Sequence, residues 1–453
     1  MKMLALLLAP VLAAAQPAAT NIETILANRV DESHRAMGLV IATIDGEGSR
    51  KVAARGKAAV PVERPLDGDT VFEIGSITKV FTSLLLADMI ERGEVKADDP
   101  VSKYLPEGVT VPSRGGKQIT LLDLSQHVSS LPRMPDQFKP ADPMNPYADY
   151  DAPKLYGFLS RTTLTRDIGE KYEYSNVGVG LLGHALARQA GTSYEELLRK
   201  RILDPLGMKS TSITLSDDQR KRLAVGHNEQ LEPVKNWDLD ALAGAGAIRS
   251  TANDMLTFAA AHLGLKKSPL DAAIARMRGS RRPTGAPGLD IAMAWHILNK
   301  TGTDLYWHNG GTGGYRSFLG FDLEGKRGVV ILCNTALSND DAGFHLLDSR
   351  APLATLKPAK VRKEVSLDPK ILTAHAGEFA LAPTFSLTIT TENGKLYAQA
   401  TGQGRAEIFA ENETEFFYKI VDAQITFNRD NEGKTTGLVL HQAGRDVPAA
   451  RIK

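Results

Sequence analysis

Residues 71 to 91 read VFEIGSITKVFTSLLLADMIE, and they are the most informative part of the chain. The portion from Ile77 to Glu91 is apolar on nearly every side, which predicts a helix buried in the core of a large domain. Gly93 follows shortly afterwards, and a glycine at that position typically ends a helix. Ser76 is therefore expected at the front of a buried helix.

Ser76 and Lys79 form a Ser-x-x-Lys pattern at this helix start. Residues three apart share one face of a helix, so the lysine amine can reach the serine hydroxyl. Burial favours the neutral, proton-accepting form of a lysine, and the first helix turn stabilises developing negative charge. The pair predicts a serine nucleophile with a lysine base. About one such pattern is expected by chance in this composition, so an ordinary helix is the alternative.

A second pattern, Tyr174-Ser175-Asn176, precedes a helix expected over 176–190. A phenol held near a cation can exchange protons with a serine or with a water, and the amide of Asn176 can bind a substrate carbonyl. The alternative is turn chemistry, in which Asn176 caps the helix and Tyr174 is a core ring.

A third pattern, YWHNGGTGGYRS over residues 306–317, leads into a strand expected over 317–322. Its glycines permit close approach of a substrate to the strand edge. The backbone N–H of Gly311, next to that of Ser76, is a plausible donor pair for an oxyanion.

Taken together and in this order, the three patterns resemble the penicillin-recognising serine hydrolases, in the branch of class C β-lactamases, DD-peptidases and their esterase relatives. The resemblance covers about residues 21–356, and VFEIG at 71–75, ITLLDLSQH at 119–127 and GAG at 244–246 look like stretches of that family. Two other hydrolase classes lack support, because neither Gly-x-Ser-x-Gly nor His-Glu-x-x-His occurs.

The resemblance implies an α+β fold in which an antiparallel sheet flanked by helices lies beside an all-helical region. It implies that Ser76 is the acylated nucleophile, Lys79 the proton acceptor, and Tyr174 an acid/base that also helps deacylation. Asn176 becomes a ligand of the substrate amide, and His308 takes the position of the third-motif Lys or His. The family needs no cofactor and no metal. Four histidines without ligand spacing are expected to be structural: His34, His127, His184 and His296.

The third motif departs from the Lys-Thr-Gly of many β-lactamases of this branch, because this chain has His308-Asn309-Gly310. The exchange removes a permanent positive charge and a hydroxyl, both suited to a substrate carboxylate. Gly311 and Arg316 complete the predicted substrate-binding set, and Arg316 is the candidate to replace the lost charge. Histidine at this position is also seen among DD-peptidase-like and esterase members.

Several substrates are therefore consistent with the sequence. An acyl-serine hydrolase acting on β-lactams ranks first, followed by a D-amino-acid peptidase (DD-carboxypeptidase) and a carboxylesterase. A penicillin-binding sensor, acylated without turnover, is the non-enzymatic alternative, because turnover also needs a positioned water.

Composition narrows the possible partners. With 453 residues, of which 42% are hydrophobic and 24% charged, the chain has the composition of a globular protein. Its 54 basic and 53 acidic side chains nearly balance, so the excess of positive charge expected of a nucleic-acid-binding protein is missing.

The single cysteine, Cys333, lies in the apolar run VVILC and is expected to be a buried strand residue. Residues 132–153 contain several prolines and are expected to form a long loop.

The first fifteen residues predict a secretory leader: Lys2 precedes an apolar run that ends in three alanines, with cleavage expected after Ala15. The run is too short to span a bilayer and contains Pro10, and no later stretch is long enough, so no membrane partner is expected. A secreted or periplasmic location follows. The sequence does not specify an oligomeric state.

Up to about residue 356 the sequence mixes short strands with amphipathic helices, whereas from about residue 367 onward it reads almost entirely as strands and turns. This change predicts a hydrolase domain over 20–356, an exposed linker over 357–366 and an all-β domain over 367–453. In the all-β domain, apolar and polar residues alternate over 385–400 on both sides of an Asn393-Gly394 turn, as they do in a hairpin. A small antiparallel sheet or barrel is therefore expected. This domain resembles the lipocalin-like β domain appended to some members of the group. A shield over the active site, a contact for oligomerisation and an inert appendage are all compatible roles.

Overall fold

The structure, a computed structural model, describes residues 20–59, 64–136, 138–299, 302–358, 362–382, 385–401, 404–419, 423–442 and 445–452. The chain divides into two compact units. The larger unit extends to Lys357 without residues 228–232, which group with residues 358–453 in the smaller unit. The predicted leader, residues 1–15, and part of the predicted linker lie outside the described residues.

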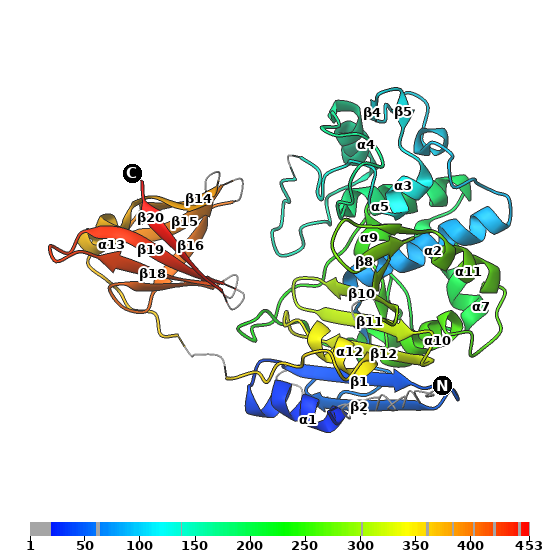
Figure 1. Cartoon of the computed structure of the whole chain (residues 1–453), viewed down its shortest axis with the longest axis horizontal. Helices are drawn as coiled ribbons and strands as arrows, with labels where there is room; N and C mark the ends of the chain where they lie inside the picture. Colours follow the sequence, from blue (N-terminus) through cyan, green and yellow to red (C-terminus); the bar gives the residue numbers. More distant parts are fainter. Residues whose placement is uncertain are drawn as a thin grey trace, which may run out of the picture. The chain divides into compact units, whose positions relative to one another are not determined.

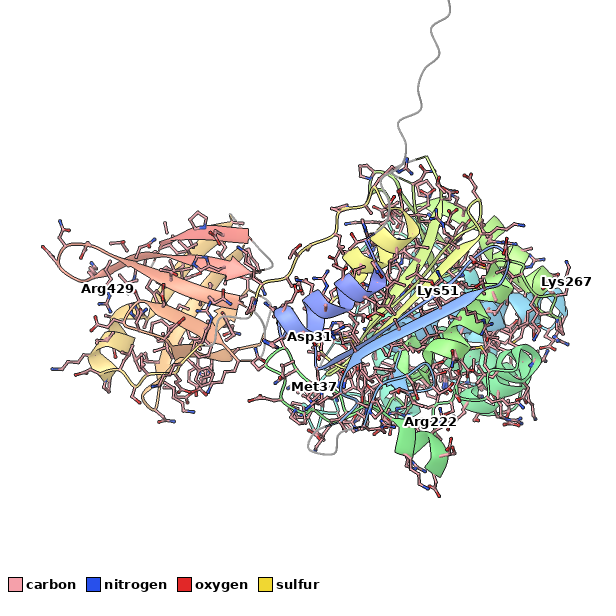
Figure 2. All side chains as sticks on the ribbon, turned by 90° about the horizontal axis from the view of Figure 1, so that it is seen from below. Asp31, Met37, Lys51, Arg222, Lys267 and Arg429 are labelled. Carbon is pink, nitrogen blue, oxygen red and sulfur yellow. The ribbon has the colours of Figure 1, made fainter. Side chains whose placement is uncertain are left out.

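An antiparallel sheet of eight strands, in the order β2-β1-β12-β11-β10-β9-β8-β7, organises the described part of the larger unit (Figure 1). Figure 2 shows Lys51 on β2, the strand at one edge of this sheet. The strands are β1 Gly38–Ile44, β2 Arg50–Gly56, β7 Arg281–Pro283, β8 Leu289–Ala292, β9 Trp295–Leu298, β10 Leu305–Gly311, β11 Arg316–Asp322 and β12 Arg327–Cys333.

The two faces of the sheet are covered by different helices. Helices α1 (Ile22–Ala27) and α12 (Asp340–Leu347) pack on the face that includes Ile331, and Cys333 is buried in that cluster, as predicted. Helix α10 (Ala252–His262) packs on the other face, which includes Leu332 and joins the main core. Neighbouring residues of a strand point to opposite faces, so each strand supplies side chains to both clusters.

Helix α2 (Thr78–Glu91) confirms the predicted buried helix, with Thr78 to Met89 all buried. Its core packing includes the Phe81 ring stacked on Phe258, with ring centroids 4.0 Å apart. One detail differs from the prediction: Ser76 lies in a separate single turn of 3-10 helix, η2 (Gly75–Ile77), directly before α2. Gly75, the first residue of this turn, has φ +50, a conformation that glycine adopts without strain.

Most of the remaining helices of the larger unit form the region beside the sheet, whereas η1 (Asn28–Glu32) lies with α1 against β1 and β2. None of the described helices is long and apolar enough to cross a membrane. They are η1 Asn28–Glu32, η3 Val101–Tyr104, α3 Leu121–Ser125, α4 Ala152–Arg161, α5 Asn176–Gln189, α6 Tyr194–Leu198, η4 Arg199–Leu203, α7 Asp204–Leu206, α8 Asp217–Arg222, α9 Ala243–Gly246 and α11 Asp271–Gly279. Two short strand pairs complete the unit: β3 Phe72–Glu73 with β6 Arg249–Ser250, and β4 Ser113–Arg114 with β5 Lys117–Gln118.

The smaller unit contains a closed antiparallel barrel of eight strands, because β20 pairs back onto β13. The predicted hairpin is confirmed: Asn393 and Gly394 both have positive φ, as its tight turn requires. A short helix, α13 (Pro369–His375), was not predicted in this region. The strands are β13 Gly377–Ala382, β14 Phe385–Glu392, β15 Lys395–Ala400, β16 Ala406–Ala410, β17 Glu415–Tyr418, β18 Ala423–Arg429, β19 Thr435–Gln442 and β20 Arg445–Arg451.

Candidate active site

The Ser76–Lys79 pair lies where η2 meets α2. The lysine Nζ is 3.0 Å from the serine Oγ and donates a second hydrogen bond, of 2.7 Å, to the carbonyl oxygen of Ala245. The Lys79 side chain is completely buried, and this burial, together with the charge of Arg133, holds its pKa well below the usual lysine value. A neutral amine at hydrogen-bond distance from a hydroxyl is positioned to take the hydroxyl proton.

Glycines allow the end of strand β10 to lie against the turn that carries Ser76. A Cβ added at Gly75 would be 2.6 Å from the backbone nitrogen of Gly311, and a Cβ at Gly310 would be 2.0 Å from the carbonyl oxygen of Ile74. Ser317 of the next strand donates a 2.8 Å hydrogen bond to that same carbonyl. The predicted oxyanion donors, the N–H groups of Ser76 and Gly311, thus belong to two segments in direct contact.

Gly310→Ala is expected to reduce turnover at least about 100-fold and to destabilise the larger unit by about 1–3 kcal/mol, as overpacking does. The added methyl group collides with backbone, so either β10 or the Ser76 turn has to move. Kinetics and thermal unfolding of the variant test this. The matched control is Gly279→Ala, at a helix end where a Cβ meets nothing within 4 Å. Equal activity of the two variants contradicts the prediction.

Tyr174 is the third member of the group. Lys79 Nζ lies 4.8 Å from the centre of its ring. Burial raises the pKa of Tyr174, while the neighbouring Ser76 hydroxyl and the charge of Arg133 act in the opposite direction. The ring stacks on His127 at 4.5 Å, and His127 Nδ1 accepts a hydrogen bond from the backbone N–H of Ser175. The phenol is therefore held rigidly and carries its proton at neutral pH.

Asn176 is the first residue of α5, and it does not cap that helix. Ser175 provides the cap instead, because its hydroxyl accepts a 2.9 Å hydrogen bond from the N–H of Gly178. The Asn176 amide nitrogen lies 3.4 Å from the sulfur of Met134, a weak acceptor. Its side chain is half-buried beside Tyr174. In this position a substrate amide can replace the Met134 sulfur as the partner of the Asn176 side chain.

Strand alternation separates His308 from Asn309. His308 is buried on the Ser76 side of β10, with its ring centroid 6.1 Å from that of Tyr174 and 5.2 Å from that of His296. Its pKa is lowered well below the usual value by burial and by the neighbouring His296 and Lys79, so the imidazole is neutral near pH 7. Asn309 projects from the other face and donates a 2.6 Å hydrogen bond to Asp340 of α12.

The two glycines and the arginine predicted near this motif have different surroundings. Gly310 and Gly311 line the contact with the Ser76 turn, as described above. Arg316, in contrast, uses its Nη1 to donate to the backbone carbonyls of Thr312, at 2.8 Å, and Tyr315, at 2.9 Å. The structure thus brings most of the predicted site residues together but not the side chain of Asn309.

Sequence reasoning missed three contributors to this site. The Ala245 carbonyl holds Lys79, and two histidines expected to be merely structural, His127 and His296, lie against Tyr174. His296 is itself held by a 2.8 Å hydrogen bond to the hydroxyl of Tyr172. Within the described residues no group of three or more His, Cys, Asp or Glu side chains is arranged to hold a metal.

This fold, with a serine hydroxyl 3.0 Å from a buried lysine amine and a tyrosine beside them, is that of a serine hydrolase that works through an acyl-enzyme. The sequence model of the Beta-lactamase family matches residues 20–349, and the chain belongs to that family. A second model, a domain of unknown function (DUF3471), matches residues 361–450.

Relatives in the family differ in their activities. Penicillin-binding protein 4* of Bacillus subtilis is 25% identical over 93% of this chain and 96% of its own length. The D-alanyl-D-alanine-carboxypeptidase/endopeptidase AmpH of Escherichia coli is 34% identical over 52% of this chain and 60% of its own length. Among solved structures, a class C β-lactamase from Rhodobacter sphaeroides has a TM-score of 0.62 and 27% identity, covering 71% of this chain and 96% of that one.

Proposed function

We propose that this serine hydrolase cleaves β-lactam amides through a covalent ester on Ser76. The observation that carries the proposal is the 3.0 Å approach of the completely buried Lys79 amine to the Ser76 hydroxyl. A serine hydroxyl is a weak nucleophile without an adjacent base, and a lysine is an effective base only when its pKa is lowered. Both conditions are met at this pair.

In the acylation step, Ser76 Oγ attacks the lactam carbonyl and Lys79 takes the hydroxyl proton. The N–H groups of Ser76 and Gly311 stabilise the oxyanion. The C–N bond then breaks, and the leaving nitrogen receives a proton through Tyr174, whose ring centre lies 4.8 Å from Lys79 Nζ. In deacylation, water adds to the ester carbonyl and loses a proton to the Lys79–Tyr174 pair. The bond between the acyl carbon and Ser76 Oγ then breaks, and the pair returns the proton to Oγ, which leaves free Ser76 and a carboxylic acid.

D-amino-acid peptides and small carboxylic esters are the second candidates, and they use the same steps. The observation that favours them is the neutral, buried His308 at a position where a lysine supplies a permanent charge in many β-lactamases of the branch. The carboxypeptidase activity named for AmpH is consistent with a peptide substrate. Asn176, Gly310 and Gly311 would hold the amide of such a peptide as they would hold the lactam side chain.

The test incubates the purified protein with a chromogenic cephalosporin, a peptide ending in D-Ala-D-Ala and a short-chain ester. Turnover and intact mass are followed together, and the adduct is located by peptide mapping. We expect steady turnover of the cephalosporin with an adduct on Ser76. A stoichiometric adduct without turnover identifies a penicillin-binding sensor instead. No turnover and no adduct with all three substrates, or an adduct on another residue, contradicts the proposal.

We also propose export, with removal of residues 1–15, because these residues have the composition of a secretory leader. The hydrolase domain over 20–356, the linker over 357–366 and the β domain over 367–453 remain the proposed division of the mature protein.

A further inference from the structure

Arg133 lies in the proline-containing loop before α4, and its guanidinium is placed over the ring of Tyr174. The distance from its Cζ to the ring centroid is 5.0 Å. The residue is exposed, and within the described residues its guanidinium has no ion pair and no hydrogen bond. A permanent cation with unused donors therefore stands beside the tyrosine of the site.

The position of Arg133 is fixed by its backbone. Its carbonyl oxygen accepts a 2.9 Å hydrogen bond from the N–H of Asn176, at the start of α5. The same short segment thus connects the arginine to the residue predicted to bind the substrate amide. The charge of Arg133 lowers the pKa of Lys79, Tyr174 and Tyr147, which places it within electrostatic reach of all three.

Other cations near the site are less suited to meet an anionic substrate. Lys79 is completely buried and bonded to Ser76 and the Ala245 carbonyl. Arg316 has its Nη1 on two backbone carbonyls, and His308 is neutral. A guanidinium offers two parallel N–H donors whose geometry matches a carboxylate, and such charge-assisted pairs are strong and directional.

We propose that Arg133 binds a carboxylate of the substrate and thereby makes the enzyme selective for acyl donors that carry one. This inference rests on the proposed function, because it concerns the same acylation at Ser76. It assigns to the loop arginine the role that a lysine or Arg316 would otherwise have in the third motif. Arg133 is a specificity residue in this scheme, and it takes no part in proton transfer.

The experiment compares a penicillin with its methyl ester, which differ in one negative charge. It uses the wild type and the variants Arg133→Gln, Arg133→Lys and Arg316→Ala. Arg220→Gln is the matched control, since it removes one exposed arginine charge from helix α8 of the same unit. The measured quantity is the ratio of kcat/KM for the acid to kcat/KM for the ester. Any general effect of Arg133 on the Lys79 base acts on both substrates and cancels in this ratio.

For Arg133→Gln the ratio is expected to fall about 10- to 100-fold, mainly through a higher KM for the acid, in line with the loss of a charged hydrogen bond. Arg133→Lys is expected to retain part of the selectivity, and Arg220→Gln all of it. An unchanged ratio in Arg133→Gln, or a fall confined to Arg316→Ala, overturns the inference. Absence of turnover of both substrates by the wild type instead overturns the proposed function.

Two D-amino-acid peptides locate the carboxylate that Arg133 binds. One carries its carboxylate on the leaving residue and the other on the acyl side chain. The peptide whose kcat/KM falls in Arg133→Gln identifies the bound group, and equal values for both peptides in variant and wild type count against the inference.

Discussion

Ser76→Ala is expected to abolish adduct formation and to lower turnover at least about 1,000-fold, because the variant has no atom that can form the acyl bond. The fold is expected to survive the change. The hydroxyl is hydrogen-bonded to Lys79, and losing such a bond costs about 1 kcal/mol. The thermal midpoint should therefore change by no more than about 4 °C in a unit of this size. Turnover, intact mass and thermal unfolding are measured on the same preparations.

A serine of helix α2, which follows the Ser76 turn, provides the control for this variant. Ser83 is buried and shares a 2.8 Å hydrogen bond with Ser125, away from the catalytic group. Ser83→Ala is expected to lose stability but to keep the adduct and the turnover. Residual turnover in Ser76→Ala above one per cent of wild type, with normal folding, would show that another residue is the nucleophile.

The sequence predicts this pair well because its geometry is local. Ser76 and Lys79 are three residues apart, and the helix that follows can be recognised in the sequence because it is apolar on nearly every side. The 3-10 turn begins at Gly75, which has a positive φ and lies against Gly311 of a distant strand. A pattern read along one helix contains no information about that contact.

The orientation of Asn309 was open to prediction. In a strand with Tyr306 and His308 on the core face, Asn309 has to point to the opposite face, where Asp340 accepts its hydrogen bond. Helix α13 was similarly detectable, because Asp368 caps it and Pro369 occupies its first position.

The surroundings of Tyr174 could not be predicted in this way. His127 comes from the segment after α3 and His296 from β9, two places far apart in the chain. Only the packing of the sheet against the helical region brings their rings to the tyrosine. A histidine without a ligand spacing therefore gives no signal of this role in the sequence.

Lys79→Met is expected to lower the acylation rate by about 100- to 10,000-fold, the usual contribution of a general base. Methionine has a similar length and no ionisable group, so it fills the buried space without accepting the Ser76 proton. The chromogenic cephalosporin gives the rate, and intact mass follows acylation directly. Unchanged acylation in this variant would assign the base to another group, with Tyr174 as the first to examine.

The same variant is expected to change how stability depends on pH. The pKa of Lys79 is lowered in the folded protein, so between that pKa and the ordinary value of about 10.4 the unfolded chain binds the extra proton. The wild type therefore gains stability as the pH rises through this window, and this contribution is absent in Lys79→Met. The thermal midpoint of the variant minus that of the wild type should decrease as the pH rises from neutral toward about pH 10. A difference that stays constant over this range would mean that Lys79 keeps its ordinary pKa, and the serine would then lack its base at neutral pH.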